Sequence, residues 1–219
     1  MRAVATIGHF TMLLVGVLTF GCNSDPAAPK SDPTTSDAAF PAYPPGPYGC
    51  TVGSTLQDFV FKGLLNPRAV NYEASDSTVT EIAMHDFYNP TKDSNKPRAL
   101  LVTESALWCN VCQTQASVAN GHYAYWHPKG VEFLDLVFED ANHNPAQNKD
   151  LKVWTETFGL ALPTALDPNF LLSCFFDKTA GPFNMIVDLA TMKITHIPTG
   201  ALDCGPDNME FAAVLGSTP

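Results

Sequence analysis

Short stretches of the chain alternate between apolar and polar residues, and short apolar runs stand between them. Alternation with a period of two is typical of half-buried strands, whereas an apolar run bounded by turn residues is typical of a buried strand. Strands are predicted at residues 55–61, 79–87, 98–102, 131–138, 183–189 and 193–197. Helices are predicted at residues 112–126, 149–158, 168–176 and 207–215. Segments rich in proline, glycine and asparagine separate these elements, as expected of turns.

The predicted element order is β-β-β-α-β-α-α-β-β-α. The two strands that flank the helix at residues 112–126 should be parallel and joined by a right-handed crossover. The last two strands, which only residues 190–192 separate, should form an antiparallel hairpin. The sequence therefore predicts an α/β fold with a mixed central sheet and helices on both faces.

The composition fits one globular domain with tails and argues against one class of function. The chain has 219 residues, of which 45% are hydrophobic, and this is enough for one core. It carries 22 acidic and 12 basic residues, which gives a net charge of -10. Binding to phosphates needs a basic patch. No basic run appears in the sequence, so we expect no nucleic-acid partner.

The N-terminus has the pattern of an export signal. A basic residue near the start precedes an apolar run at residues 10–20. This run is too short to span a bilayer comfortably. A charged start, an apolar centre and a small residue before a break are typical of a signal peptide. We therefore predict a signal peptide at residues 1–21.

The end of this segment, VLTFGC, resembles the signal of a bacterial lipoprotein. In such signals the chain is cut before the cysteine, which is then acylated. Gly21 fits the position before the cut, whereas Thr19 and Phe20 fit the pattern poorly. We predict a lipoprotein-type signal with Cys22 as the lipid attachment residue. The alternative is an ordinary signal peptide and a secreted protein.

The composition changes after the signal. Residues 22–47 are rich in proline, serine, aspartate and alanine, and such a segment cannot bury enough apolar surface to fold. We predict a disordered tether at residues 22–47 and a folded domain at residues 48–219. The predicted location is extracytoplasmic, in the periplasm or cell envelope, with the membrane reached through the lipid anchor.

The stretch ALWCNVC places Cys109 and Cys112 between a predicted buried strand and a predicted helix. At the start of a helix, unpaired N–H groups and the positive end of the helix dipole favour a thiolate. The pKa of cysteines at such sites falls from about 8.5 toward roughly 3.5–7.5. Two intervening residues leave the cysteines close enough to form a disulfide. We expect Cys109 to attack, Cys112 to resolve, and Trp108 to shield the site.

Two structural roles for this cysteine pair are weaker alternatives. A zinc site needs two further ligands, and His122, His127 and His143 do not show ligand spacing. A disulfide between residues so close in the chain removes little chain entropy, so it stabilises a fold poorly. We therefore expect a redox role that needs no metal and no organic cofactor.

Five stretches, considered together, carry a family resemblance. They are YGCTVGSTLQDFVFKG, RALLVTESALWCNVC, GVEFLDLVFED, ALPTALDPNFLLSCFF and AGPFNMIVDLATMKITHIPTG. From about Gly49 to the C-terminus the chain resembles the thioredoxin-like superfamily. Within it, the chain is similar to the redoxin branch of bacterial membrane-tethered thiol–disulfide oxidoreductases of the TlpA and ResA type. The resemblance implies a thioredoxin-like fold with an N-terminal β-hairpin extension.

The resemblance also implies an active-site neighbourhood. Pro182 would be a cis-proline packed against the two cysteines, and Gly181 would leave its backbone edge uncrowded for an extended substrate peptide. Asn110 and Val111 lie between the cysteines and lack the proline that is frequent there. Because this dipeptide tunes the reduction potential, the direction of electron flow stays open.

Three further positions bear on the chemistry. ResA-like proteins carry a glutamate where this chain has Gln115, which cannot exchange a proton. Glu104 and Glu139 are candidates for a proton relay, although a solvated loop acid is the favoured interpretation of each. Peroxiredoxins keep a threonine where this chain has Ala106, which disfavours peroxidase activity.

Three cysteines remain besides Cys22 and the CxxC pair, and they are Cys50, Cys174 and Cys204. One bridge among them is expected, with the pairing left open. Cys204 is either a third redox thiol or, as the favoured interpretation, a bridged or buried residue.

The predicted function is thiol–disulfide exchange with extracytoplasmic proteins through the CxxC dithiol. The expected partners are protein thiols and disulfides, together with an upstream membrane thiol reductase or oxidase. Two alternatives are a non-catalytic scaffold or binding lipoprotein of the same fold, and a peroxide-reducing redoxin.

Overall fold

The computed structural model describes residues 42–198 and 200–216. The predicted signal peptide, Cys22 and most of the predicted tether lie outside these residues, so they stay predictions. Tyr43, near the end of the predicted tether, packs on Tyr88 with ring centroids 5.8 Å apart. Its hydroxyl donates to the carbonyl oxygen of Leu56 at 2.9 Å. Contact with the folded domain therefore begins before residue 48. In the described part of the chain, no helix combines the length and apolar character needed to cross a membrane.

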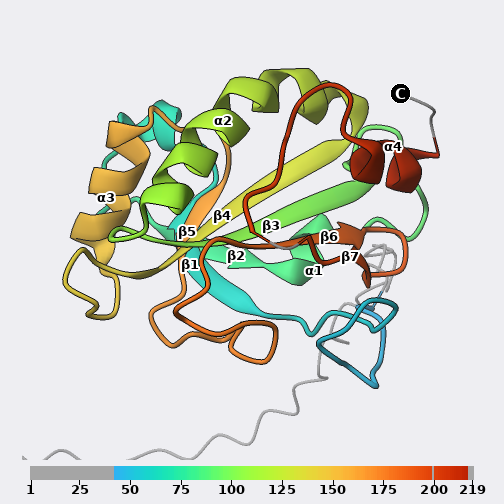
Figure 1. Cartoon of the computed structure of the whole chain (residues 1–219). Coiled ribbons are helices and arrows are strands. Elements are labelled where there is room, and N and C mark those ends of the chain that lie inside the picture. Colours follow the sequence, from blue (N-terminus) through green and yellow to red (C-terminus); the bar gives the residue numbers. More distant parts are fainter. Residues whose placement is uncertain (1–41, 199, 217–219) are drawn as a thin grey trace, which may run out of the picture. The chain divides into compact units, whose positions relative to one another are not determined.

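Seven strands form one mixed sheet in the order β2-β1-β5-β4-β3-β6-β7 (Figure 1). The strands are β1 Val60–Leu64, β2 Thr80–Ala83, β3 Ala99–Ala106, β4 Val131–Glu139, β5 Thr164–Leu166, β6 Phe183–Asp188 and β7 Lys193–His196. The central pair β3–β4 is parallel, and so is β4–β5. The pair β6–β7 is antiparallel. The parallel pairing predicted from the β-α-β order and the antiparallel hairpin predicted from the short connection are both confirmed.

The three longer helices cover one face of the sheet (Figure 1). They are α2 Asn110–Trp126, α3 Asn148–Thr157 and α4 Met209–Leu215. Phe133 and Asp135 are two residues apart in β4, so their side chains lie on the same side of the strand. Their contacts with α4 and α3 show that this side is the helix-covered face. Phe211 of α4 lies 5.7 Å from the ring of Phe133. Trp154 of α3 donates its indole N–H to Asp135 at 2.7 Å.

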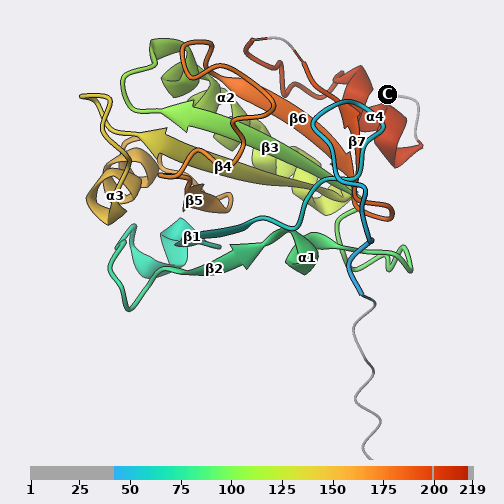
Figure 2. The same ribbon diagram turned by 90° about the horizontal axis from the view of Figure 1, so that it is seen from below.

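The opposite face is covered by the one-turn helix α1 (Met84–Phe87) and by irregular segments (Figure 2). Leu100 and Val102 of β3 point to this side and belong to the same buried cluster as Met84 and Leu172. Every residue of β3 and of β4 is buried. The predicted α/β fold with a mixed sheet and helices on both faces is confirmed, with only a single turn of helix on the second face.

The N-terminal hairpin extension is also present. Strands β1 and β2 pair antiparallel from Val60 opposite Ala83 to Gly63 opposite Thr80. The other edge of β1 pairs with β5, which joins the extension to the central sheet. The connection between β1 and β2 contains the 3-10 turn η1, Pro67–Val70. A second 3-10 turn, η2 (His127–Lys129), follows α2 at the predicted stop signal.

Three predicted elements differ from the structure. The predicted strand at residues 55–61 is displaced toward the C-terminus, because β1 begins only at Val60 and continues through Gly63 to Leu64. The predicted strand at residues 79–87 ends at Ala83, because the side chain of Asp86 accepts from the N–H of Ala83 and begins α1. The predicted helix at residues 168–176 is a series of turns. Asp167 does accept from the N–H groups of Leu171 and Leu172. Phe170, however, has φ of 52°, a left-handed conformation that a right-handed helix does not contain.

A disulfide connects Cys50 with Cys174, which lie 124 residues apart in the chain. It joins the N-terminal segment to the segment at residues 167–182, which connects β5 with β6. This is the bridge that the sequence left unassigned among three cysteines. Cys204 is left as a buried free thiol.

Candidate active site

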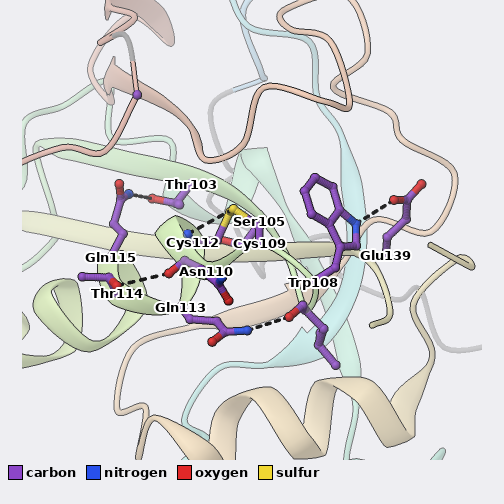
Figure 3. Close-up of a disulfide and its surroundings, with 12 residues drawn as sticks. Thr103, Ser105, Trp108, Cys109, Asn110, Cys112, Gln113, Thr114, Gln115 and Glu139 are labelled. Carbon is purple, nitrogen blue, oxygen red and sulfur yellow. Dashed lines mark hydrogen bonds between the residues drawn. A yellow bond between two sulfur atoms is a disulfide. The ribbon is translucent and has the colours of Figure 1, made fainter. Parts of the chain in front are cut away.

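Cys109 and Cys112 form a disulfide at the point where β3 gives way to α2 (Figure 3). Cys109 is the N-cap of α2, and its Sγ accepts from the N–H of Cys112 at 3.1 Å. The turn before it is fixed by Gln113, whose side-chain amide donates to the carbonyl oxygen of Leu107 at 2.7 Å. A buried strand followed by a helix N-terminus therefore holds both sulfur atoms, as the sequence predicted.

The two cysteines differ in their access to solvent. Cys109 is 6% exposed, whereas Cys112 is fully buried. Val111 between them is 51% exposed, and Asn110 is exposed as well. Of the two cysteines, only Cys109 therefore has any solvent-accessible surface.

The peptide bond between Gly181 and Pro182 is cis, as the resemblance implied. It lies against the disulfide. A Cβ atom added to Gly181 would stand 3.1 Å from Sγ of Cys112 and 3.5 Å from Sγ of Cys109. Phe183, the next residue after Pro182, begins β6 and pairs with Glu104 of β3. The cysteines and the 181–182 edge, 69 or more residues apart in sequence, thus meet at one end of the sheet.

If the cysteine pair exchanges disulfides with protein substrates, Gly181→Ala should slow that exchange by roughly tenfold, because small displacements of reacting groups have effects of this order. The added methyl would push the 181–182 edge away from the sulfur atoms. Exchange rates with a protein disulfide would measure this. The matched control is Gly121→Ala in α2, where an added Cβ meets nothing within 4 Å. Equal rates for wild type and Gly181→Ala would contradict the expected contact.

Trp108 lies beside the disulfide and is held by a buried carboxylate (Figure 3). Its indole N–H donates to Oε2 of Glu139 at 2.9 Å. Glu139 also pairs with Lys178, at 3.2 Å, and with His143, at 3.5 Å. The ring of His143 stands 4.8 Å from that of Trp108. Glu139 is therefore no solvated loop acid. It orients Trp108 and links it to Lys178, three residues before Gly181.

Glu104 is also no solvated loop acid. It is fully buried in β3, opposite Leu136 of β4 and Phe183 of β6. Neither carboxyl oxygen has a hydrogen-bond partner among the described residues. Burial, followed by the charges of Asp167 and Asp135, raises the pKa of Glu104 well above its usual value. A buried carboxylate without a partner is costly, so the folded protein favours the protonated acid.

This environment predicts a pH-dependent stability that Glu104→Gln removes. Between the ordinary carboxyl pKa and the raised one, the folded chain holds a proton that the unfolded chain has lost, so stability falls as pH rises. One extra bound proton lowers the free energy of unfolding by at most about 1.4 kcal/mol for each step of one in pH. Urea unfolding from pH 4 to pH 7 should therefore show Glu104→Gln gaining stability relative to wild type as pH rises. Glu81→Gln, at an exposed carboxylate of β2, is the control. Parallel curves for wild type and Glu104→Gln would contradict this assignment.

The sequence reasoning missed several buried polar residues near the site. Asp135 accepts from Ser105 at 3.0 Å and from Trp154. Burial raises the pKa of Asp135 to about 6, although both hydrogen bonds lower it. Thr103 and Asn184 are buried close to Gln115. The sequence did contain a signal for such residues, namely a polar residue at a buried position of a strand that is otherwise apolar.

Cys204 does not belong to this site. Its carbonyl oxygen accepts from the indole N–H of Trp126 at 2.8 Å, and Trp126 ends α2. Cys109 precedes the other end of that helix, about 25 Å away at the usual rise per residue. Burial raises the pKa of Cys204 to about 12. The proposal of a third redox thiol is therefore wrong, and Cys204 is a buried core residue.

Of the three histidines weighed as zinc ligands, His122 lies in α2, His127 directly follows that helix, and His143 lies in the loop after β4. His127 pairs with Glu132 at 3.2 Å, and His143 pairs with Glu139. In the part of the chain that the structure describes, no three histidine, cysteine, aspartate or glutamate residues gather in a metal-binding arrangement.

Comparisons with known proteins identify the architecture. No family model and no curated protein sequence matches the chain. Several solved structures do. A secreted thiol-disulfide isomerase from Corynebacterium glutamicum has a TM-score of 0.55 at 12% identity, covering 75% of this chain and 86% of that one. A thiol:disulfide interchange protein, a thioredoxin family protein from Chlorobium tepidum, has a TM-score of 0.52 at 15% identity, covering 76% and 100%. A reduced 2-Cys peroxiredoxin from Plasmodium vivax has a TM-score of 0.52 at 12% identity, covering 75% and 94%. The chain therefore has the thioredoxin-like fold, with the N-terminal hairpin extension that the sequence predicted.

Proposed function

We propose that this protein is a thiol–disulfide oxidoreductase that exchanges disulfides with extracytoplasmic proteins through Cys109 and Cys112. The observation that carries this proposal is the placement of the pair. A disulfide at a helix N-terminus, with Cys109 slightly exposed and Cys112 fully buried, lies against the backbone of Gly181. A disulfide that served only to staple the fold would gain little from closing so short a loop.

In the reducing direction the reaction has two steps. The Cys109 thiolate attacks one sulfur of the substrate disulfide, a mixed disulfide forms, and the other substrate sulfur leaves as a thiolate that takes a proton from water. The Cys112 thiolate then attacks Sγ of Cys109, and the second substrate sulfur leaves in the same way. Two electrons pass to the substrate, and the Cys109–Cys112 disulfide forms. The oxidising direction is the reverse.

Local groups favour the attacking thiolate. The N–H of Cys112 points at Sγ of Cys109 at 3.1 Å, and the dipole of the 17-residue helix α2 places its positive end there. Both stabilise negative charge on sulfur. Trp108 precedes Cys109 in the chain, and Glu139 fixes the direction of its indole. The edge at Gly181 and Pro182 offers backbone groups to which an extended substrate peptide can pair.

The proposed location is extracytoplasmic, with an acylated Cys22 as anchor and a membrane thiol reductase or oxidase as the upstream partner. The N-terminal sequence supports this proposal, and so does the Cys50–Cys174 bridge, since such disulfides persist in oxidising compartments. One similar structure is described as secreted and another as a thiol:disulfide interchange protein. The alternative is the same protein released into the medium.

Two assays with the purified protein test the proposed function. Reduced protein should accelerate the dithiothreitol-dependent reduction of insulin, and Cys109 should be alkylated at pH 6 much faster than free cysteine. No acceleration and slow alkylation would leave a non-catalytic scaffold of the same fold. Consumption of hydrogen peroxide with dithiothreitol, without any action on insulin, would indicate a peroxide-reducing redoxin instead.

A further inference from the structure

Two rows of side chains face one another across the candidate site. Gln115 follows Cys112 by three residues in α2, so the two side chains share one side of the helix. Asn184 follows Pro182 by two residues at the start of β6, so their side chains share one side of the strand. Helix α2 and the segment at residues 181–184 therefore contact each other at two points. The first is the disulfide beside Gly181, and the second, one helical turn further along α2, is Gln115 beside Asn184.

The second meeting point is a reciprocal amide pair. The side-chain N–H of Gln115 donates to Oδ1 of Asn184 at 2.5 Å. The side-chain N–H of Asn184 donates in return to Oε1 of Gln115 at 3.2 Å. Gln115 is 2% exposed and Asn184 is fully buried. Because hydrogen bonds are directional, two reciprocal bonds between the amide groups fix both their distance and their relative orientation.

Further hydrogen bonds complete the network. The hydroxyl of Thr103 in β3 donates to Oδ1 of Asn184 at 2.9 Å. It also accepts from the side-chain amide of Gln115 at 3.3 Å (Figure 3). The N–H of Leu202 donates to Oε1 of Gln115 at 2.8 Å, and Asn184 donates to the carbonyl oxygen of Gly200 at 2.9 Å. The network therefore joins β3, α2, β6 and residues 200–202. It contains no ionisable side chain, and none of its side-chain atoms is left without a partner.

We propose that Gln115 and Asn184 are positioning residues that hold the Gly181–Pro182 edge in register against the cysteine pair. This inference rests on the proposed thiol–disulfide exchange. Apolar side chains would fill the same volume, but they would not fix direction. A fully satisfied polar network in a buried site is costly to rearrange and specifies one arrangement. Gln115 and Asn184 thus determine where a substrate peptide, hydrogen-bonded to the backbone at Gly181 and Pro182, presents its sulfur to Cys109.

A matched pair of variants separates this role from general stability. Asn120 is also an amide of α2, and it makes three hydrogen bonds to a different region. Its side chain donates to the carbonyl oxygens of Phe158 and Gly159, and it accepts from the N–H of Ala161. Gln115→Ala and Asn120→Ala each remove a side-chain amide that connects α2 to another segment. Only the first acts on the 181–182 edge.

The experiment compares two substrates in full-length protein. With a protein disulfide such as insulin, kcat/KM should fall by about tenfold or more in Gln115→Ala and stay within about twofold of wild type in Asn120→Ala. With glutathione disulfide, which is too small to use the edge fully, both variants should react at nearly the wild-type rate. Gln115→Met, which keeps the length of the side chain, serves the same comparison if the alanine variant does not fold.

Each result has a distinct meaning. Equal losses in Gln115→Ala and Asn120→Ala, or equal losses toward insulin and glutathione disulfide, would overturn the positioning role. A similar loss in Asn184→Ala, with no further loss in the double variant with Gln115→Ala, would support it, because the two residues would act as one unit. A wild type that exchanges with neither substrate would remove the proposed function itself, and the inference with it.

Discussion

Serine in place of Cys112 should stop the exchange reaction at a mixed disulfide between Cys109 and the substrate protein. Cys109 is the slightly exposed cysteine, and Cys112 is the buried group that has to release the substrate. Without that second sulfur the first step proceeds and the second does not. Non-reducing electrophoresis with mass spectrometry of the band should show the covalent complex, and insulin reduction should fall to the uncatalysed rate.

Two controls fix the assignment of roles. Cys109→Ser should be equally inactive but should trap nothing, because the attacking sulfur is gone. Cys204→Ser should leave exchange unaffected, since that thiol lies at the other end of α2. A trapped complex in Cys109→Ser and none in Cys112→Ser would reverse the roles. Exchange at the wild-type rate in both variants would rule out this cysteine pair.

Loss of the Cys50–Cys174 disulfide should lower the stability of the fold more than loss of the Cys109–Cys112 disulfide. It closes a loop between residues 124 apart in sequence. Removing such a disulfide lowers the free energy of unfolding by about 2–4 kcal/mol, mainly because the unfolded chain gains conformational entropy. For a domain of this size the loss corresponds to a fall in Tm of about 5–15 °C. Calorimetry of the variant with Cys50→Ala and Cys174→Ala would measure it.

The natural comparison is the second disulfide of the same molecule. Replacing Cys109 and Cys112 by alanine opens a loop between residues only three apart, and the entropy model gives such a loop little effect. We therefore predict a lower Tm for the variant without the Cys50–Cys174 disulfide than for the variant without the Cys109–Cys112 disulfide. If the CxxC variant loses as much stability as the Cys50–Cys174 variant, the division into one structural bridge and one reactive bridge is wrong.

The sequence predicted the elements whose residues have a single clear periodicity. The apolar run before the CxxC pair became β3, the segment after it became α2, and the apolar run at residues 131–138 became β4. Short elements escaped. Strand β5 has only three residues, too few for a periodic signal. The predicted helix at residues 168–176 had a capping aspartate, but the left-handed Phe170 decided the outcome.

The candidate site divides in the same way. Cys109, Cys112 and Trp108 adjoin one another in the chain, so local sequence was enough to find them. Gly181 and Pro182 came only through the family resemblance, because nothing in their own sequence points to a distant disulfide. The pairing of Gln115 with Asn184, and that of Trp108 with Glu139, joins side chains 69 and 31 residues apart. Such contacts follow from packing, which a periodic pattern does not specify.

The reduction potential of the Cys109–Cys112 pair tests the central claim most directly. Protein with Cys50, Cys174 and Cys204 replaced would be equilibrated with glutathione or dithiothreitol mixtures, and the fraction of dithiol would be read by mass shift after alkylation. We predict reversible equilibration with a potential between about -270 mV, typical of reductants, and about -120 mV, typical of oxidants. A pair that does not equilibrate, or a potential below about -300 mV, is the property of a structural disulfide and would contradict the account.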